Sequence, residues 1–165
     1  MKMYGSSLIH GLLSLFFAVT AMLLGWSAPA GAQTAVTTAT TSVAVTVQGT
    51  ASAPSESVSF SGQANLVAQV GTDPNLPAAP PVVVLWVDLS GVTGVGASSN
   101  KKYVTTDRYI VNRPLAATDV VQLSFPFYLS TGNPQAASVG MTTFNLSYNT
   151  STLQLTAATG SIGNP

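Results

Sequence analysis

Apolar and polar residues alternate along most of the chain, and this period of two predicts β-strands. The longest alternation spans residues 56–70 (ESVSFSGQANLVAQV), with apolar or small residues on one face and mainly serine, glutamine and asparagine on the other. The same pattern recurs over residues 43–48, 120–129 and 141–148. Alternation of this kind is typical of a strand that buries one face.

One segment, residues 82–89 (VVVLWVDL), is apolar on both phases apart from its aspartate. β-Branched residues pack well on a pleated surface, and the run is bounded by Pro80-Pro81 and Gly91. It is too short for a membrane helix. We therefore expect a central strand that is buried on both faces.

Weaker strand signals fall at residues 101–105 and 108–112, and residues 153–157 are expected to form a hairpin with the strand at 141–148. Glycine and proline mark the segments 71–81, 90–100 and 130–140 as loops. Two single residues modify the expected strands. Gly62 predicts a bend or bulge, and Pro126, which has no N–H to donate, predicts an edge strand or a bulge.

These elements predict an all-β fold, since no segment after the first 32 residues shows helical apolar spacing. Short strands separated by turns favour an antiparallel β-sandwich of about seven strands, immunoglobulin-like in architecture only. A small β-barrel is the second choice. Residues 43–165 are expected to form a single domain.

The N-terminus has the pattern of a cleaved secretory signal peptide over residues 1–32. Lys2 precedes an apolar run at 12–24, and Ala30-Gly31-Ala32 provides a small-x-small cleavage site. The apolar run is shorter than the roughly 20 residues of a membrane span, which argues against an uncleaved anchor. We expect an exported protein, periplasmic, extracellular or on the cell surface, with no membrane span after cleavage and a flexible arm at residues 33–42.

The composition removes most catalytic chemistry from the mature chain. Its only histidine, His10, lies in the signal peptide, and there is no cysteine. Ser–His and Cys–His nucleophiles and most zinc or copper sites are therefore excluded. We expect no enzyme activity, no cofactor and no metal.

A carboxylate pair of the glycosidase kind is the remaining catalytic option. None of the acids lies in a recognisable motif. Asp73-Pro74-Asn75 could supply oxygen ligands to calcium, but an Asx-turn before proline explains it without an ion. The acids are Glu56, Asp73, Asp88, Asp107 and Asp119.

Trp86 and Asp88 share one phase of the central strand. In one interpretation they form an exposed platform, where the indole stacks on a sugar ring and the carboxylate accepts hydrogen bonds from its hydroxyls. In the other, Trp86 packs in the core and Asp88 faces solvent at the end of the strand. The second is favoured, because a tryptophan on such an apolar strand is usually a core residue.

The four basic residues that remain after removal of the signal peptide lie close together in the sequence, with tyrosines between them. Such a patch fits an anionic surface polymer, such as an anionic polysaccharide or lipopolysaccharide, or the surface of a partner. Alternatively, the charges keep an edge strand from pairing with a neighbour. The near-zero net charge argues against nucleic acid. The cations are Lys101, Lys102, Arg108 and Arg113.

Val43, Val45 and Val47 occupy one face of the first strand. This strand could be donated to a neighbouring subunit, its valines entering alternate pockets, or it could open the protein's own sandwich, which is the favoured interpretation. The chain is thus expected to be a structural or adhesive protein, self-associating by β-strand pairing. The alternative function is a monomeric carbohydrate-binding module.

Overall fold

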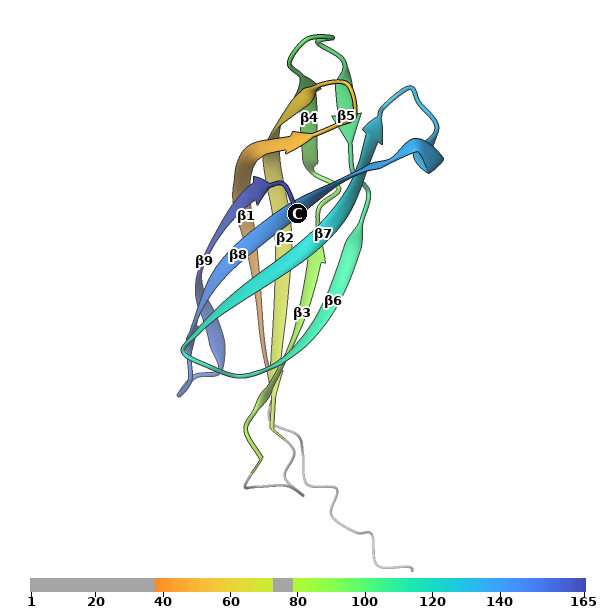
Figure 1. The fold of residues 1–165 in the computed structure, drawn as a ribbon. Helices are drawn as coiled ribbons and strands as arrows, with labels where there is room; N and C mark the ends of the chain where they lie inside the picture. Colours follow the sequence, from red (N-terminus) through yellow and green to blue (C-terminus); the bar gives the residue numbers. More distant parts are fainter. Residues whose placement is uncertain (1–37, 73–78) are drawn as a thin grey trace, which may run out of the picture. The chain divides into compact units, whose positions relative to one another are not determined.

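The computed structural model describes residues 38–72 and 79–165, in which nine strands form one hydrogen-bonded sheet (Figure 1). The predicted signal peptide and the first five residues of the predicted arm lie outside these ranges. The prediction of an all-β fold is confirmed, with nine strands where about seven were expected. The strands are β1 (Thr38–Ser52), β2 (Ser57–Gly71), β3 (Val82–Asp88), β4 (Val92–Gly96), β5 (Lys102–Val104), β6 (Arg108–Pro114), β7 (Thr118–Leu129), β8 (Ser138–Asn149) and β9 (Gln154–Gly163), with a short 3-10 helix at Pro134–Ala136.

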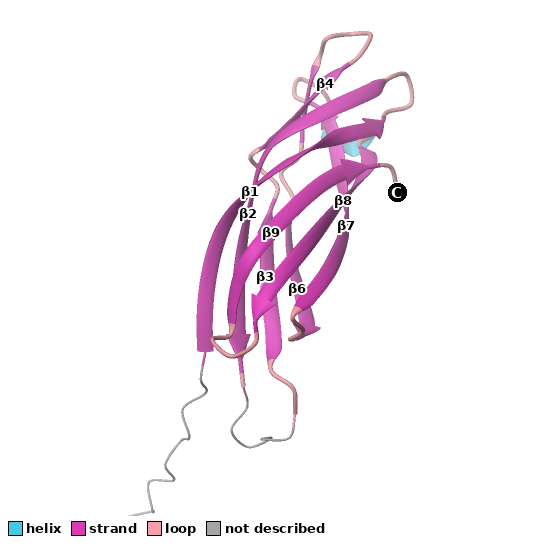
Figure 2. Cartoon of the chain, turned by 90° about the vertical axis from the view of Figure 1, so that its left-hand side faces the viewer, coloured by secondary structure: helices cyan, strands magenta, loops and turns pink. Residues whose placement is uncertain are grey.

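The sheet folds over into two layers (Figures 1 and 2). One layer has the order β1-β2-β3-β6, and the other has the order β9-β8-β7. Strands β4 and β5 connect β2 to β7 at one end, and β9 returns to β1, so part of the sheet closes into a ring. Strands β1 and β9 run parallel over three residue pairs, so the sheet is mixed rather than purely antiparallel.

The long hairpin of β1 and β2 carries the first layer. All 15 residues of each strand are paired without a register shift. Strand β1 begins at Thr38, so residues 38–42 of the predicted arm are part of a strand. Threonine favours extended backbone, and these residues pair with the apolar end of β2, from Val67 to Gly71. The low complexity of this segment concealed its strand character.

Strand β3 was predicted to be buried on both faces, and this is wrong. Val83, Leu85 and Val87 point into the core, with 1–2% of their surface exposed. The opposite phase is only partly buried, and Val82 is 47% exposed. The second layer covers only the inner face of the first, so the outer residues of β3 remain accessible despite their apolar character.

The segment 90–100, predicted as a loop from its glycines, contains strand β4. Gly94 is opposite Phe60 of β2 in the ladder. A Cβ atom at Gly94 would lie 2.6 Å from Cγ1 of Val58 and 2.8 Å from Cε1 of Phe60. The glycine is therefore part of the packing of the strand, because its missing side chain makes room for these two residues.

Gly62 and Pro126 have identifiable roles. No bulge occurs at Gly62 in the ladder with β1. Instead, β2 pairs with β4 up to Gly62 and with β3 from Asn65 onward. The carbonyl of Gly91 occupies the space that a Cβ atom of residue 62 would need. Pro126 lies in β7, whose side away from β8 has ladder partners only at Tyr128 and Leu129 among the described residues. The predicted edge strand is confirmed.

Three phenylalanines form the centre of the core between the layers. The ring centroid of Phe60 in β2 lies 5.7 Å from that of Phe125 and 4.9 Å from that of Phe127. Both contacts are edge-to-face. All three rings are at most 3% exposed. Such pairs add about 0.5–1.5 kcal/mol to the free energy gained by burial. This cluster compensates in part for the absence of disulfides.

The sandwich is open between β6 and β7, and side chains bridge the opening. The Tyr109 hydroxyl shares its one hydrogen between the carbonyl of Ser124, at 2.7 Å, and Oδ2 of Asp107, at 2.8 Å. Near the other end of β6, Arg113 forms an ion pair with Asp119 over 2.8 Å. These contacts hold the two free edges together where no backbone ladder joins them.

The carboxylate of Glu56 fastens the β4–β5 hairpin to the turn after β1. It accepts hydrogen bonds from the amides and hydroxyls of Ser98 and Ser99 and from the Tyr103 hydroxyl, at 2.6–3.0 Å. These bonds, those from Ser99 first, lower the pKa of Glu56 to about 2. Gly96 permits the contact, because a Cβ atom there would overlap the carboxylate.

We expect this carboxylate to make stability depend on acid pH. Because its pKa is lower in the folded protein than in the unfolded chain, its contribution is complete above about pH 4.5 and is lost as pH falls toward 2. Urea unfolding of the wild type should therefore show a decline over this window. The decline should be shallower in Glu56→Gln, and identical pH profiles for the two proteins would refute the assignment.

Candidate functional site

Trp86 lies on the outer face of the first layer, not in the core. In the ladder it is opposite Val67 of β2 and Ile110 of β6. It is only partly buried, and Ile110 is 67% exposed. The favoured interpretation of Trp86 as a core residue is therefore wrong. The second layer covers the face of β3 that carries Val83, Leu85 and Val87. Trp86 lies on the opposite face.

Asp88 forms the next row on the same face. It is opposite Asn65 of β2 and Arg108 of β6, and residues directly opposite each other in antiparallel strands share a face. Two rows, one mainly apolar and one polar, thus lie side by side across β2, β3 and β6. The sequence did not associate Asn65, Val67 or Ile110 with Trp86, since only the register aligns them.

A hollow of about 520 Å³ lies along these rows. This volume is within the range typical of small-ligand sites, about 300–1,000 Å³. The indole and two aliphatic side chains supply its apolar surface, and amide, carboxylate and guanidinium groups supply its polar surface. Its principal lining residues are Asn65, Val67, Trp86, Asp88, Arg108 and Ile110.

An ion pair orders the polar row. The Nε atom of Arg108 donates to Oδ2 of Asp88 over 2.9 Å, while the Ser90 amide donates to Oδ1 over 2.9 Å. Hydrogen bonds from Ser90, followed by the charge of Arg108, lower the pKa of the Asp88 carboxyl. Asp88 is 27% exposed and Arg108 is 76% exposed. Arg108 therefore presents its terminal nitrogens to solvent beside Trp86, while Asp88 holds it in place.

The four cations of the predicted patch lie on or beside two strands, and two of them are paired with acids. Arg108 and Arg113 lie on β6 and pair with Asp88 and Asp119. Lys102 lies on β5, which is not a neighbour of β6 in the sheet, and Lys101 immediately precedes β5. Pairing and separation reduce the positive field that their proximity in sequence suggested.

The valines of the predicted donor strand lie in the protein's own sandwich. Val43, Val45 and Val47 pair with Leu66, Ala64 and Gly62 of β2. Val45 and Val47 are 4% and 0% exposed, and Val43 packs against the core. Within this chain the strand therefore pairs with β2 of the same sandwich.

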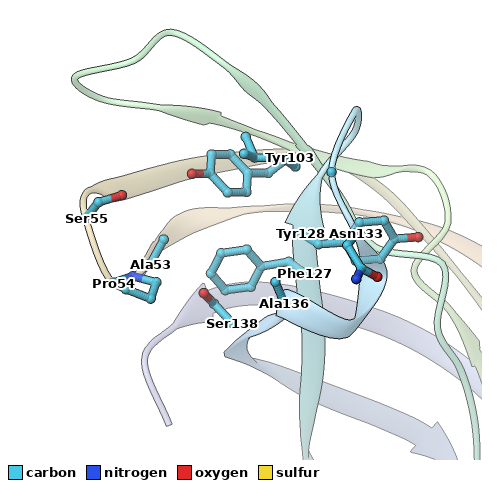
Figure 3. Close-up of a pocket in the computed structure, with 11 residues that line it drawn as sticks. Ala53, Pro54, Ser55, Tyr103, Phe127, Tyr128, Asn133, Ala136 and Ser138 are labelled. Atoms are coloured by element: carbon cyan, nitrogen blue, oxygen red, sulfur yellow. The ribbon is translucent and has the colours of Figure 1, made fainter.

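A second hollow, of about 220 Å³, lies where the β1–β2 turn meets the ends of β5 and β7 (Figure 3). The rings of Tyr103 and Phe127, 5.9 Å apart, border it with Ala53 and Pro54. The Tyr103 hydroxyl already donates to Glu56 over 2.9 Å. The lining also carries the polar side chains of Ser55, Asn133 and Ser138, and the Asn133 oxygen already accepts from the Gln135 amide over 2.9 Å. The hollow has less than half the volume of the one beside Trp86.

The described carboxylates accept hydrogen bonds from the chain itself. Glu56 and Asp88 are bonded as above, Asp107 accepts from Tyr109 over 2.8 Å, and Asp119 accepts from Arg113. Asp73, the acid of the possible calcium-binding segment Asp73-Pro74-Asn75, lies outside the described residues. Within residues 38–72 and 79–165, no group of three or more acids or histidines could hold a metal ion.

Comparisons of the chain with protein-family models, with curated proteins and with solved structures found no match. Over the part of the chain that the structure describes, no helix has the length and apolar character needed to cross a membrane.

Proposed function

We propose that this protein is a non-catalytic carbohydrate-binding protein that acts after export, and that its outer face around Trp86 is the binding site. The observation that carries the proposal is the outward position of Trp86 beside the polar row of Asn65, Asp88 and Arg108. The predicted signal peptide supports export.

The chemistry of a sugar ring matches the two rows. A pyranose presents C–H groups on its faces and hydroxyls around its rim. The indole of Trp86 offers a flat apolar surface for the ring face. Arg108 and the Asn65 amide offer donors and an acceptor for the rim. Asp88 contributes mainly by holding Arg108, because both of its oxygens already accept hydrogen bonds.

Two carboxylates argue for binding rather than hydrolysis. A glycosidase needs a general acid whose pKa is raised, so that it is protonated near neutral pH. Hydrogen bonds lower the pKa of Glu56 to about 2, and Ser90 and Arg108 lower that of Asp88. Both groups are thus held in the ionised form.

Glycan-array screening of the protein after signal removal, followed by calorimetry on the glycans retained, tests the proposal. We expect retention by the wild type and its loss in Trp86→Ala. Equal retention by both proteins would place any glycan binding elsewhere, and no retention by the wild type would refute the function.

A structural or adhesive subunit that self-associates by strand pairing is the second candidate. The observation that favours it is the edge of β1. On the side away from β2, only Val47, Gln48 and Gly49 of this strand have ladder partners among the described residues. The earlier part of β1 thus presents backbone groups to which a strand from a second copy could add.

The mass of the protein in solution tests this second candidate. Strand addition at β1 predicts oligomers that grow with concentration, and Ala44→Pro should reduce them, because proline cannot donate a ladder hydrogen bond. Thr156→Pro in β9 serves as a control for the general effect of proline in a strand. A monomer at all concentrations would refute self-association and leave the carbohydrate proposal unaffected.

A further inference from the structure

We infer that the ligand is a neutral glycan chain, and that it crosses the strands from β6 over Trp86 and β2 to β1. This inference rests on the proposed function and deepens it, since it gives the class of the glycan and its path. It is carried by the charge and the size of the side chains that share the outer face with Trp86.

The outer face of β1, β2, β3 and β6 is almost free of ionisable groups. The register places along it a surface of serine, threonine, glutamine, asparagine and aliphatic residues. Asp88 and Arg108 are its one acid and one base on these four strands, and they form a pair. The face therefore has no net charge to attract an ionic polymer.

An acidic sugar gains little from charge at the hollow itself, because Asp88 already neutralises Arg108, the one base on this face of the four strands. A carboxylate placed on the terminal nitrogens of Arg108 would also lie near the ionised Asp88 carboxylate. Each charge–charge interaction at such separations amounts to about 1 kcal/mol in water, so the repulsion from Asp88 offsets much of the attraction to Arg108. Hydroxyl groups can accept the same hydrogen bonds without this repulsion.

The path follows from the size of the side chains. In the row of Trp86 the β1 residue is Ser42, and in the row of Asp88 it is Ala44. Both are short and exposed, so the surface is open on the β1 side. Strands in a sheet lie about 4.8 Å apart, so β1 is about 10 Å from β3. Two further sugar residues beyond the one on Trp86 can therefore contact β2 and β1.

Calorimetry with defined oligosaccharides separates the parts of this inference. The probes are hexamers of β-linked glucose, xylose and mannose as neutral glycans, and hexamers of galacturonate and mannuronate as acidic ones. We expect at least one neutral hexamer to bind, with an affinity that changes less than about threefold between 0.02 and 0.5 M salt, because no ion pair forms with the ligand. Acidic hexamers should bind at least tenfold more weakly.

A variant on β1 tests the path. Ala44→Glu places a longer, charged side chain in the row of Asp88, and we expect about a tenfold loss of affinity for the neutral hexamer and little change for the matching disaccharide. Thr50→Glu, on the same strand and face but six residues along, is the matched control and should bind both as the wild type does.

A different result would contradict each part of the inference. Tighter binding of an acidic hexamer, or an affinity that falls steeply with salt, would overturn the neutral class while leaving the carbohydrate function intact. Equal effects of Ala44→Glu and Thr50→Glu would overturn the path. Binding of none of the five hexamers would overturn this inference, and retention of no glycan on the array would refute the carbohydrate function as well.

Discussion

Replacing Trp86 with alanine is expected to weaken glycan binding by about 30-fold or more while leaving the fold in place. A central aromatic contact of this kind contributes about 2 kcal/mol or more to binding, and each 1.4 kcal/mol is a factor of ten. The loss of stability should stay below about 1.5 kcal/mol, because Trp86 is only partly buried and lies outside the core. Calorimetric titration and urea unfolding measure the two quantities separately.

Val82→Ala is the matched control for Trp86→Ala. Val82 lies on the same strand and the same face, four residues away, and is 47% exposed. The Val82→Ala variant should bind glycan with the same affinity as the wild type. If Trp86→Ala instead lowers the free energy of unfolding by the roughly 3–5 kcal/mol typical of a core aromatic, the outward position of Trp86 is wrong. The proposed sugar platform would then be wrong as well. Full retention of glycan binding in Trp86→Ala would also contradict the proposal.

Phe125→Ala should cause the largest loss of stability, about 3–5 kcal/mol, because it leaves a cavity at the centre of the sandwich. The Phe125 ring is 0% exposed and contacts Phe60 edge-to-face. Gly140 packs directly on it, and a Cβ atom there would lie 2.7 Å from Cζ of Phe125. Urea unfolding monitored by tryptophan fluorescence measures the loss.

The control for Phe125→Ala comes from the same strand. Val120 of β7 is 52% exposed, so Val120→Ala should change the free energy of unfolding by less than about 0.5 kcal/mol. A loss below about 1 kcal/mol in Phe125→Ala would mean that the aromatic cluster is not tightly packed. If enough of the variant remains folded, it should still bind glycan, because the proposed site lies on the opposite side of the first layer.

The hydrophobic pattern alone was enough to predict the fold class and most of the strands. Alternation over residues 56–70, 120–129 and 141–148 predicted β2, β7 and most of β8, because a period of two separates the faces of a strand wherever one face is buried. Pro126 predicted an edge, since it cannot donate to a ladder. The lack of histidine and cysteine after residue 32 excluded the commonest nucleophilic catalysis without any structure.

Tertiary structure decided which face of each strand is covered, and so it decided the candidate site. Alternation separates Trp86 from Val87, but on a strand that is apolar on both phases it does not indicate which phase the second layer will cover. Register then brings Asn65, Asp88 and Arg108 into one row, although Asn65 and Arg108 are more than 40 positions apart in the chain. Such alignments depend on pairing between strands remote in sequence, and no local pattern carries that information.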